Sequence, residues 1–139
     1  MTLRLNPYVS FKNNAREAIE FYHSVFGGDL IINTFADLHA SQGPDEDNLV
    51  MHSMLVAPNG LTLMASDTTS RMPHNPGDNI SVSLSGEAED EELLKGYWAG
   101  LMAGGTETMP LAKAVWGDSF GMGVDKYGIS WLVNITAAN

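Results

Sequence analysis

The chain has 139 residues, of which 44% are hydrophobic and 17% are charged, with a formal net charge of −10 and no cysteine. This composition indicates one globular domain, or two small modules that share a core. The negative charge disfavours nucleic-acid and anionic-membrane partners, and the missing thiols exclude disulfides, zinc-thiolate sites and cysteine nucleophiles. The absence of cysteine makes the cytoplasm the expected compartment. Because no run of about 18 apolar residues occurs, we expect no membrane partner.

The first half of the chain predicts the element order βαβββ. Residues 3–11 alternate as in a strand, and a helix follows, with Asn14 as N-cap, Glu17 completing a capping box and Gly27-Gly28 as its end. Its apolar stripe is Ala15, Ala18, Ile19, Tyr22, Val25 and Phe26. A strand over 29–35 and a mobile polar loop over 36–48 come next, and then two strands that Asn59-Gly60 joins as a hairpin.

The pattern restarts after a proline-containing connector over residues 68–78. A strand over 79–85 precedes a helix with acidic residues in its first turn, which suit the positive end of the helix dipole. Leu93, Leu94, Tyr97, Trp98, Leu101 and Met102 form the apolar face of this helix, and Gly104-Gly105 ends it. Three further strands give a second βαβββ unit. A generic α+β domain with two coincidentally similar helices is the alternative to this internal repeat.

The sequence therefore predicts an α+β fold, with a first module over residues 1–67, the connector over 68–78 and a second module over 79–139, together one structural domain. Within its strands, one set of side chains is apolar and is expected to pack under the helices. Asn, Ser, Thr, Tyr and Met occupy the alternate positions. Such side chains suit a partly enclosed cavity, although a plain solvated sheet face is the alternative.

Three stretches resemble one protein family: "NPYVSFKNNAREAIEFYHSVFGGDL", "MHSMLVAPNGLTLMASD" and "VWGDSFGMGVDKYGISWLVN". They are similar to the PhnB-like branch of the vicinal oxygen chelate superfamily, which includes glyoxalase I, bleomycin-resistance proteins and extradiol dioxygenases. The likeness covers residues 3–135. It implies the glyoxalase/bleomycin-resistance fold, in which two βαβββ modules form curved mixed sheets around a ligand pocket, usually in a homodimer.

The resemblance also implies positions for the metal ligands of the superfamily, and these fall near Asn6, Met64, Asn79 and Leu132. A catalytic divalent metal needs about three imidazole or carboxylate ligands, so we expect neither the usual metal nor any other cofactor. The alternative is a metal-dependent lyase or dioxygenase with a rearranged ligand set, such as His52 with Asp67 or Asp118. Some relatives carry a quinone-methyltransferase label, but no glycine-rich strand-to-helix turn suited to a methyl-donor nucleotide is visible.

We expect a pocket for a small organic ligand, and the sequence identifies no catalytic residue. Its predicted lining consists of Tyr8, His52, Met64, Ser81, Trp116 and Asn134. Tyr8, Ser81 and Asn134 would orient polar groups of the ligand, and Met64 and Trp116 would supply apolar contact. His52 is either a pocket base or hydrogen-bond donor, or a histidine satisfied at a sheet edge or interface.

Trp116 and Phe120 are predicted to lie in a strand that Gly117, Gly121 and Gly123 interrupt. The glycines either bend the sheet around a ligand or let the rings pack between the modules. A structural or interaction module with a vestigial pocket is a further reading of the whole chain.

Overall fold

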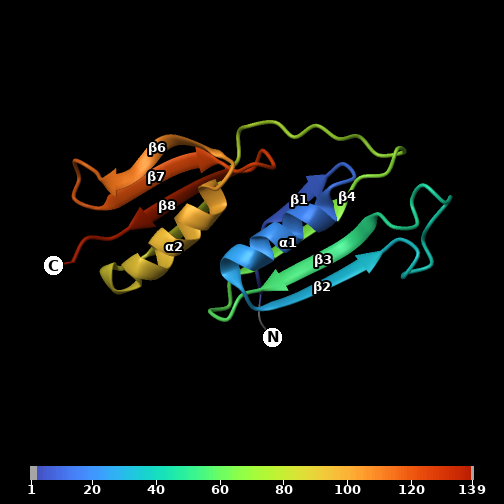
Figure 1. Ribbon diagram of the computed structural model, residues 1–139, viewed down its shortest axis with the longest axis horizontal. Coiled ribbons are helices and arrows are strands. Elements are labelled where there is room, and N and C mark those ends of the chain that lie inside the picture. Colours follow the sequence, from blue (N-terminus) through green and yellow to red (C-terminus); the bar gives the residue numbers. More distant parts are fainter. Residues whose placement is uncertain (1–2, 139) are drawn as a thin grey trace. The chain divides into compact units, whose positions relative to one another are not determined.

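The computed structural model describes residues 3–138, which form an α+β fold of two modules with the same element order (Figure 1). Residues 1, 2 and 139, which belong to the predicted modules, lie outside the described residues. Residues up to Pro76 form one compact unit and residues from Gly77 form another. The boundary between the two units falls within the predicted connector.

The first unit is a four-stranded mixed sheet with one helix. Its elements are β1 (Tyr8–Phe11), α1 (Ala15–Phe26), β2 (Asp29–Thr34), β3 (Val50–Val56) and β4 (Thr62–Asp67). The strand order is β1-β4-β3-β2, with β1 parallel to β4 and the other pairs antiparallel. The turn between β3 and β4 contains Asn59 and Gly60, as predicted.

The second unit repeats this topology. Its elements are β5 (Val82–Gly86), the short 3-10 helix η1 (Ala88–Asp90), α2 (Glu91–Met102), β6 (Thr106–Lys113), β7 (Ser119–Val124) and β8 (Ser130–Ile135). The strand order is β5-β8-β7-β6, and again only the first pair, β5 and β8, is parallel. Two four-stranded mixed sheets of identical connectivity confirm the predicted duplication of a βαβββ unit.

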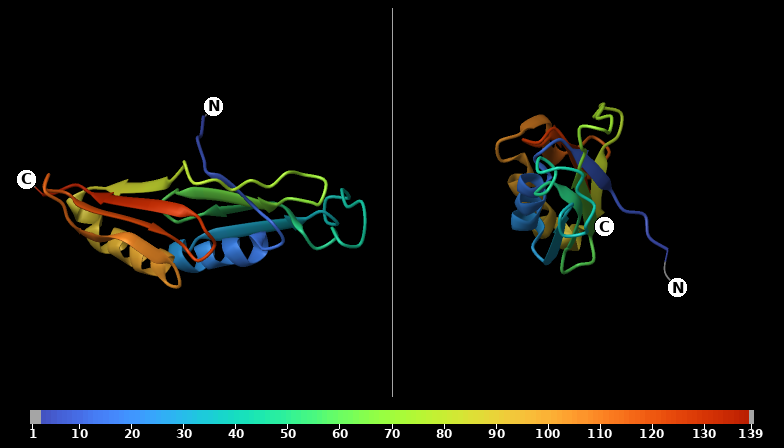
Figure 2. Two further views of the ribbon diagram at one scale, coloured as in Figure 1. Left: turned by 90° about the horizontal axis from the view of Figure 1, so that it is seen from above. Right: turned by 90° about the vertical axis from the view of Figure 1, so that its right-hand side faces the viewer.

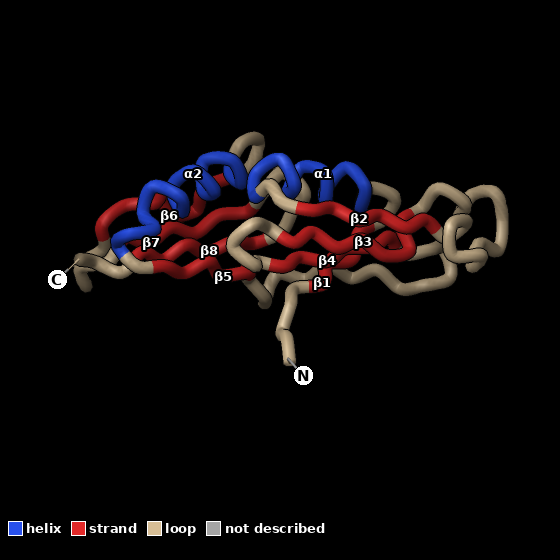
Figure 3. The backbone as a smooth tube through the Cα atoms, turned by 90° about the horizontal axis from the view of Figure 1, so that it is seen from below, coloured by secondary structure: helices blue, strands red, loops and turns tan. Residues whose placement is uncertain are grey.

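Each helix covers one face of the sheet in its own unit, as Figure 3 shows with helices in blue and strands in red. The buried stripe of α1 is Ala15, Ala18, Ile19, Tyr22 and Phe26, and that of α2 is Leu94, Tyr97, Trp98 and Leu101. Val25 and Met102, which the sequence placed in these stripes, remain partly exposed, and Leu93 is exposed. The alternation of apolar and polar strand residues is confirmed, since Leu63, Ala65, Trp131 and Val133 are buried beneath the helices.

The beginning of α1 differs from its prediction. Asn14 does precede the helix, but its side chain makes no capping hydrogen bond. Asp67, at the end of β4, supplies the cap from a distant part of the sequence: its Oδ1 accepts a hydrogen bond from the Ala15 amide at 2.9 Å. Its Oδ2 accepts one from the Val50 amide, also at 2.9 Å. One buried carboxylate therefore joins the helix start to two strands.

The loop over residues 36–48, which was predicted to be mobile, is anchored to the chain after β4. Glu46 in this loop is only 4% exposed and forms an ion pair with Arg71, which lies just after β4. Arg71 Nη2 donates to Glu46 Oε1 at 2.8 Å, and Arg71 Nε donates to Oε2 at 3.2 Å. This hydrogen-bonded guanidinium lowers the pKa of the Glu46 carboxyl. The beginning of the predicted connector thus belongs to the first unit.

No helix within residues 3–138 has the length and apolar character that a membrane span requires.

Candidate functional site

The face of each sheet that is turned away from its helix is called here the open face. In the first unit it carries an apolar row that crosses all four strands. Tyr8 lies opposite Met64, Met64 lies opposite Met54, and Met54 lies opposite Ile31. Tyr8 and Ile31 are 48% and 54% exposed. The row therefore presents one aromatic ring, two thioethers and an aliphatic side chain on the surface of this unit.

Tyr8 and His52, both predicted pocket residues, contact each other on this face. Their rings stack with centroids 5.9 Å apart and an interplanar angle of 30°. The Tyr8 hydroxyl and His52 Nδ1 are 3.5 Å apart, which is the outer limit of a hydrogen bond. Because this bond is long, both groups retain the capacity to exchange it for a stronger one with a ligand. The first unit thus brings Tyr8, His52 and Met64 together.

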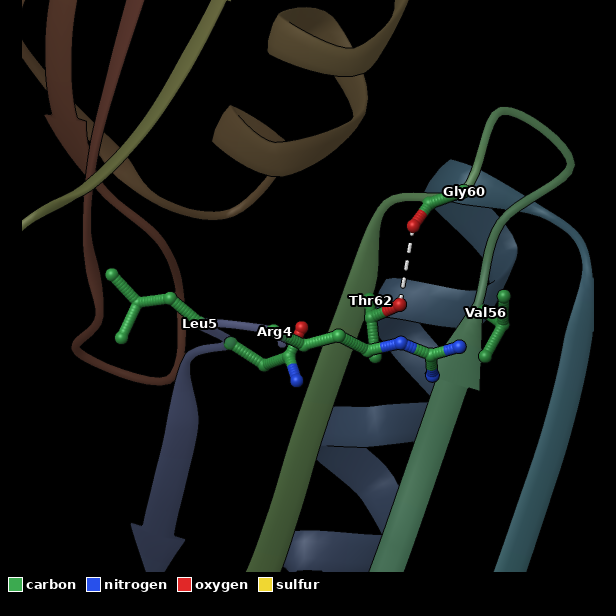
Figure 4. Close-up of a pocket in the computed structure, with 6 residues that line it drawn as sticks. Arg4, Leu5, Val56, Gly60 and Thr62 are labelled. Atoms are coloured by element: carbon green, nitrogen blue, oxygen red, sulfur yellow. Dashed lines mark hydrogen bonds between the residues drawn. The ribbon is translucent and has the colours of Figure 1, made fainter. Parts of the chain in front are cut away.

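A pocket of about 400 Å³ lies next to the apolar row, at the end of the face near the turn between β3 and β4 (Figure 4). It is lined by Arg4, Leu5, Asn6, Val56, Gly60 and Thr62. Figure 4 shows the Arg4 side chain crossing β4 toward Val56. Arg4 was not among the residues predicted from the sequence, and it lies in the segment before β1, which begins at Tyr8.

The second unit has an equivalent row on its own open face. Ser83 lies opposite Leu132, Leu132 lies opposite Met122, and Met122 lies opposite Met109. The topological positions match those of Tyr8, Met64, Met54 and Ile31, so both units carry a mainly apolar row, with Ser83 in place of the Tyr8 ring. Ser81, a predicted pocket residue, is exposed and precedes β5, whereas Ser83 occupies the row itself.

Trp116 and Asn134, the remaining predicted residues, both belong to the second unit. Trp116 lies in the turn between β6 and β7 rather than in a strand, and it is 60% exposed. Its ring contacts that of Phe120 edge-on at 5.8 Å, and Phe120 lies opposite Asn134. Asn134 Nδ2 donates to Asp118 Oδ2 at 3.3 Å, which orients the amide. Two aromatic rings and an oriented amide thus gather at one end of this face.

Gly121 and Gly123 of β7 face α2, whereas bending of the sheet around a ligand would require them to act on the open face. A Cβ on Gly123 would lie 2.3 Å from the Met102 sulfur of α2. A Cβ on Gly121 would lie 3.0 Å from the Leu111 Cα of β6 and 3.1 Å from the Trp98 ring. Both glycines therefore allow close approach of α2 and β6, and the prediction that they bend the sheet around a ligand is not supported.

The rearranged metal set is not assembled by the residues considered for it. Asp67 is buried on the helix side of its sheet, where backbone amides occupy both of its oxygens, while His52 lies on the open face. Asp118 accepts hydrogen bonds from Asn134 and from the Ala137 amide. Within residues 3–138, no three His, Asp or Glu side chains are grouped closely enough to hold a metal ion.

The positions that the resemblance implies for metal ligands carry the wrong donors for such an ion. Met64 offers a thioether, Asn6 and Asn79 offer amides, and Leu132 offers an alkyl chain. Hard divalent metals prefer carboxylates, and zinc prefers imidazole, thiolate or carboxylate. The residues present do not fit a catalytic divalent metal.

The turns that lead from a strand into a helix also differ from a nucleotide-binding turn. The turn before α1 consists of residues 12–14, Lys-Asn-Asn, in which Asn13 has a φ of 70°. The segment before α2 contains Glu87 and η1, and Glu91 and Glu92 follow in the first turn of α2. Neither turn is glycine-rich, so neither allows the close backbone approach that a glycine-rich strand-to-helix turn gives to a nucleotide. These turns do not fit a methyl-donor nucleotide.

Comparison with known proteins identifies the family. A family model described as 3-demethylubiquinone-9 3-methyltransferase matches residues 4–134. The crystal structure of protein PA1353 from Pseudomonas aeruginosa is 34% identical, has a TM-score of 0.82, and the match covers 99% of this chain and 100% of that one. A putative 3-demethylubiquinone-9 3-methyltransferase, PhnB protein, from Bacillus cereus is 27% identical and has a TM-score of 0.73. That match covers 96% of this chain and 100% of the Bacillus chain.

The fold also recurs in a more distant structure. A glyoxalase/bleomycin resistance protein/dioxygenase family enzyme from Burkholderia phytofirmans PsJN is 11% identical and has a TM-score of 0.58, with 94% of this chain and 96% of that one covered. At this identity the likeness concerns the fold alone. The chain therefore belongs to the PhnB-like family whose model is described as 3-demethylubiquinone-9 3-methyltransferase, and it has the glyoxalase/bleomycin-resistance fold.

Proposed function

We propose that this protein binds a small organic molecule on the open faces of its sheets, as a cytoplasmic homodimer and without a catalytic divalent metal. The observation that carries the proposal is the row of Tyr8, Met64, Met54 and Ile31, together with the contact between Tyr8 and His52. Ligand sites combine an apolar surface with a few placed hydrogen-bonding groups, and this face has both. Sheet faces that only meet water usually carry Lys, Glu and Arg instead.

Each predicted residue has a role in this proposal. Met64 supplies a polarisable apolar surface, and a thioether packs favourably against an aromatic ligand. Tyr8 and His52 exchange their long mutual hydrogen bond for bonds to polar ligand atoms. In the second unit, Trp116 supplies a ring and Asn134 an amide that Asp118 already orients. Ser81 completes the predicted set as a hydroxyl just before β5.

Homodimer formation is supported by the apolar side chains that each unit leaves exposed. Ile31 and Tyr8 in one sheet and Met109 and Met122 in the other are exposed, and covering apolar surface stabilises by about 25 cal/mol per Å². A second copy of the chain is the partner that we propose for part of this surface. Sedimentation velocity across a range of concentrations should show a dimer, and a monomer at every concentration would refute this part of the proposal.

Methyl transfer, which the family description names, receives no support from the residues present. The turns before α1 and α2 do not fit a methyl-donor nucleotide, so we derive no step through one. Nor does any grouping of His, Asp and Glu in the described part of the chain favour a metal-dependent lyase or dioxygenase. Binding without a resident metal is the function that this geometry supports best.

The proposal is tested by a thermal-shift screen of small aromatic and aliphatic molecules, because a ligand that binds the folded state raises the Tm. Hits should lose their shift in Met64→Ala and Tyr8→Ala. Met72→Ala is the matched control, since this exposed methionine lies outside the sheet. A complete absence of hits would favour an interaction module with a vestigial pocket.

The metal alternative is tested separately by elemental analysis of untagged protein. Stoichiometric zinc, manganese, iron or nickel that disappears in His52→Ala would overturn the proposal.

A further inference from the structure

We propose that the ligand carries an oxyanion on an apolar or aromatic body, and that Arg4 binds this oxyanion at the end of the open face of the first unit. The inference deepens the proposed function and rests on it, because it assumes that the apolar row of Tyr8, Met64, Met54 and Ile31 contacts a ligand. It adds the chemical class of that ligand and a residue that determines specificity.

The chain segment before β1 places Arg4 on the ligand side of the sheet. Figure 2 shows this segment leaving β1 on the side of the sheet opposite α1. The Pro7 carbonyl accepts a hydrogen bond from the Met64 amide at 3.1 Å, which continues the pairing of β1 with β4. The backbone just before Tyr8 is therefore held beside β4, and Arg4 reaches the pocket from this tethered segment.

The pocket and the apolar row lie next to each other along the strands, on the same face of the sheet. Val56 lies opposite Thr62, and two residues further along the same strands Met54 lies opposite Met64. Residues two apart on a strand are separated by about 6.6 Å. A ligand whose acidic group lies about 7 Å from the centre of its apolar body can therefore contact Arg4 and Met64 together. His52 lies two residues beyond Met54 on β3.

The charge of the pocket favours an anion. The chain has only 7 basic residues against 17 acidic ones, yet Arg4 lines this pocket. Among residues 3–138, the ion pairs are Arg71–Glu46 and Lys95–Glu91, so Arg4 belongs to neither. A guanidinium binds carboxylate, sulfonate and phosphate through charge-assisted hydrogen bonds, and the Asn6 amide can donate a further one. The Thr62 hydroxyl already donates to the Gly60 carbonyl at 3.1 Å, so it supports the turn beside the pocket.

One acidic residue, Asp29, lies in the same row of paired strand residues as the pocket residue Val56. Asp29 lies opposite Val56 on the far edge strand β2. Asp29 limits the attraction for an anion without cancelling it, because a guanidinium can contact the oxyanion directly while Asp29 acts through solvent.

Two fluorescent probes with the same aromatic skeleton test the inference. 1-Anilinonaphthalene-8-sulfonate carries a sulfonate, and N-phenyl-1-naphthylamine is its neutral counterpart. A chain with a net charge of −10 repels an anion overall, so a preference for the sulfonate probe requires a local cation. We expect Arg4→Gln to weaken binding of the sulfonate probe about tenfold, the size of one charge-assisted hydrogen bond, and to leave the neutral probe unchanged.

Arg16→Gln is the matched control, because Arg16 lies on α1 and this substitution removes the same charge from the opposite side of the sheet. Met64→Ala should weaken both probes equally, which locates them on the open face. If the two probes bind equally and Arg4→Gln alters neither, the inference fails while the proposed function stands. The inference is also overturned if Arg16→Gln weakens binding of the sulfonate probe as much as Arg4→Gln does, because the effect then comes from the overall charge of the protein. If neither probe binds, the inference and the proposed function fail together.

Discussion

Glu46 and Arg71, which are far apart in the sequence, form a hydrogen-bonded ion pair that fastens the loop after β2 to the chain after β4. Glu46 is almost fully buried, whereas the Arg71 side chain is 47% exposed. The pair fixes a loop that borders the first sheet, so its contribution to stability can be measured without disturbing the open face.

The lowered pKa of Glu46 predicts a specific response to acid. Hydrogen bonds from Arg71 are the largest cause of this shift from the usual value of 4.5. A group whose pKa is lower in the folded state contributes stability above its unfolded pKa, and this stability is lost as the pH falls through the folded pKa. We expect the free energy of unfolding to fall as the pH drops below about 4.5, and Glu46→Gln to reduce that dependence. Urea unfolding at pH 7, 5 and 3.5 measures it.

The control for this prediction is Asp45→Asn, which removes an exposed carboxylate from the same loop. Glu46→Gln should also lower the stability at pH 7, whereas Asp45→Asn should have little effect. Equal acid sensitivity of wild type and Glu46→Gln would show that the ion pair contributes nothing to folding.

Asp67 is predicted to be a major stabilising residue of the first unit. Asp67→Ala removes both acceptors and leaves the Ala15 and Val50 amides without these bonds. We expect a loss of about 2–4 kcal/mol in the free energy of unfolding, from one helix cap and one buried charge-assisted hydrogen bond. Asp67→Asn should cost less because it retains one acceptor. The exposed Asp78 provides the control, and an Asp67→Ala variant as stable as Asp78→Ala would contradict the assigned role.

The second unit offers two glycine substitutions of opposite expected sign. Gly123→Ala places a methyl group 2.3 Å from the Met102 sulfur and 2.9 Å from the Thr106 carbonyl oxygen, so it should destabilise by about 1–3 kcal/mol. Gly96→Ala on α2 meets nothing within 4 Å and should stabilise the protein by about 0.5–1 kcal/mol, since alanine favours the helix. Thermal and urea unfolding compare the two, and a neutral Gly123→Ala would refute the close packing of α2 against β7.

Asp29→Asn provides a gain of affinity that tests the anion-binding pocket independently of Arg4. Two unit charges about 10 Å apart in water interact by about 0.4 kcal/mol, which corresponds to about a twofold change in affinity. We expect Asp29→Asn to strengthen binding of 1-anilinonaphthalene-8-sulfonate about twofold at low salt. The gain should vanish at 1 M salt, where the screening length is about 3 Å. Weaker binding in this variant would place the sulfonate elsewhere.

The sequence alone determined the element order, the duplication of the βαβββ unit and the two faces of each sheet. Periodicity was sufficient for this, because apolar residues at spacings of two and 3.6 must lie on one side of a strand or helix wherever the rest of the chain lies. Leu63, Ala65, Trp131 and Val133 were assigned to the buried face on this basis alone. Asn59-Gly60 identified its turn because its preference is local.

Only the tertiary structure decided which distant residues meet. The helix cap comes from Asp67 and not from Asn14, the anchor of the polar loop is Arg71, and Gly123 of β7 makes room for Met102. None of these contacts leaves a local pattern, because each depends on strand register and on which elements stack. Arg4 shows the same limit, because the segment that carries it is brought beside Val56 and Thr62 only by the pairing of β1 with β4.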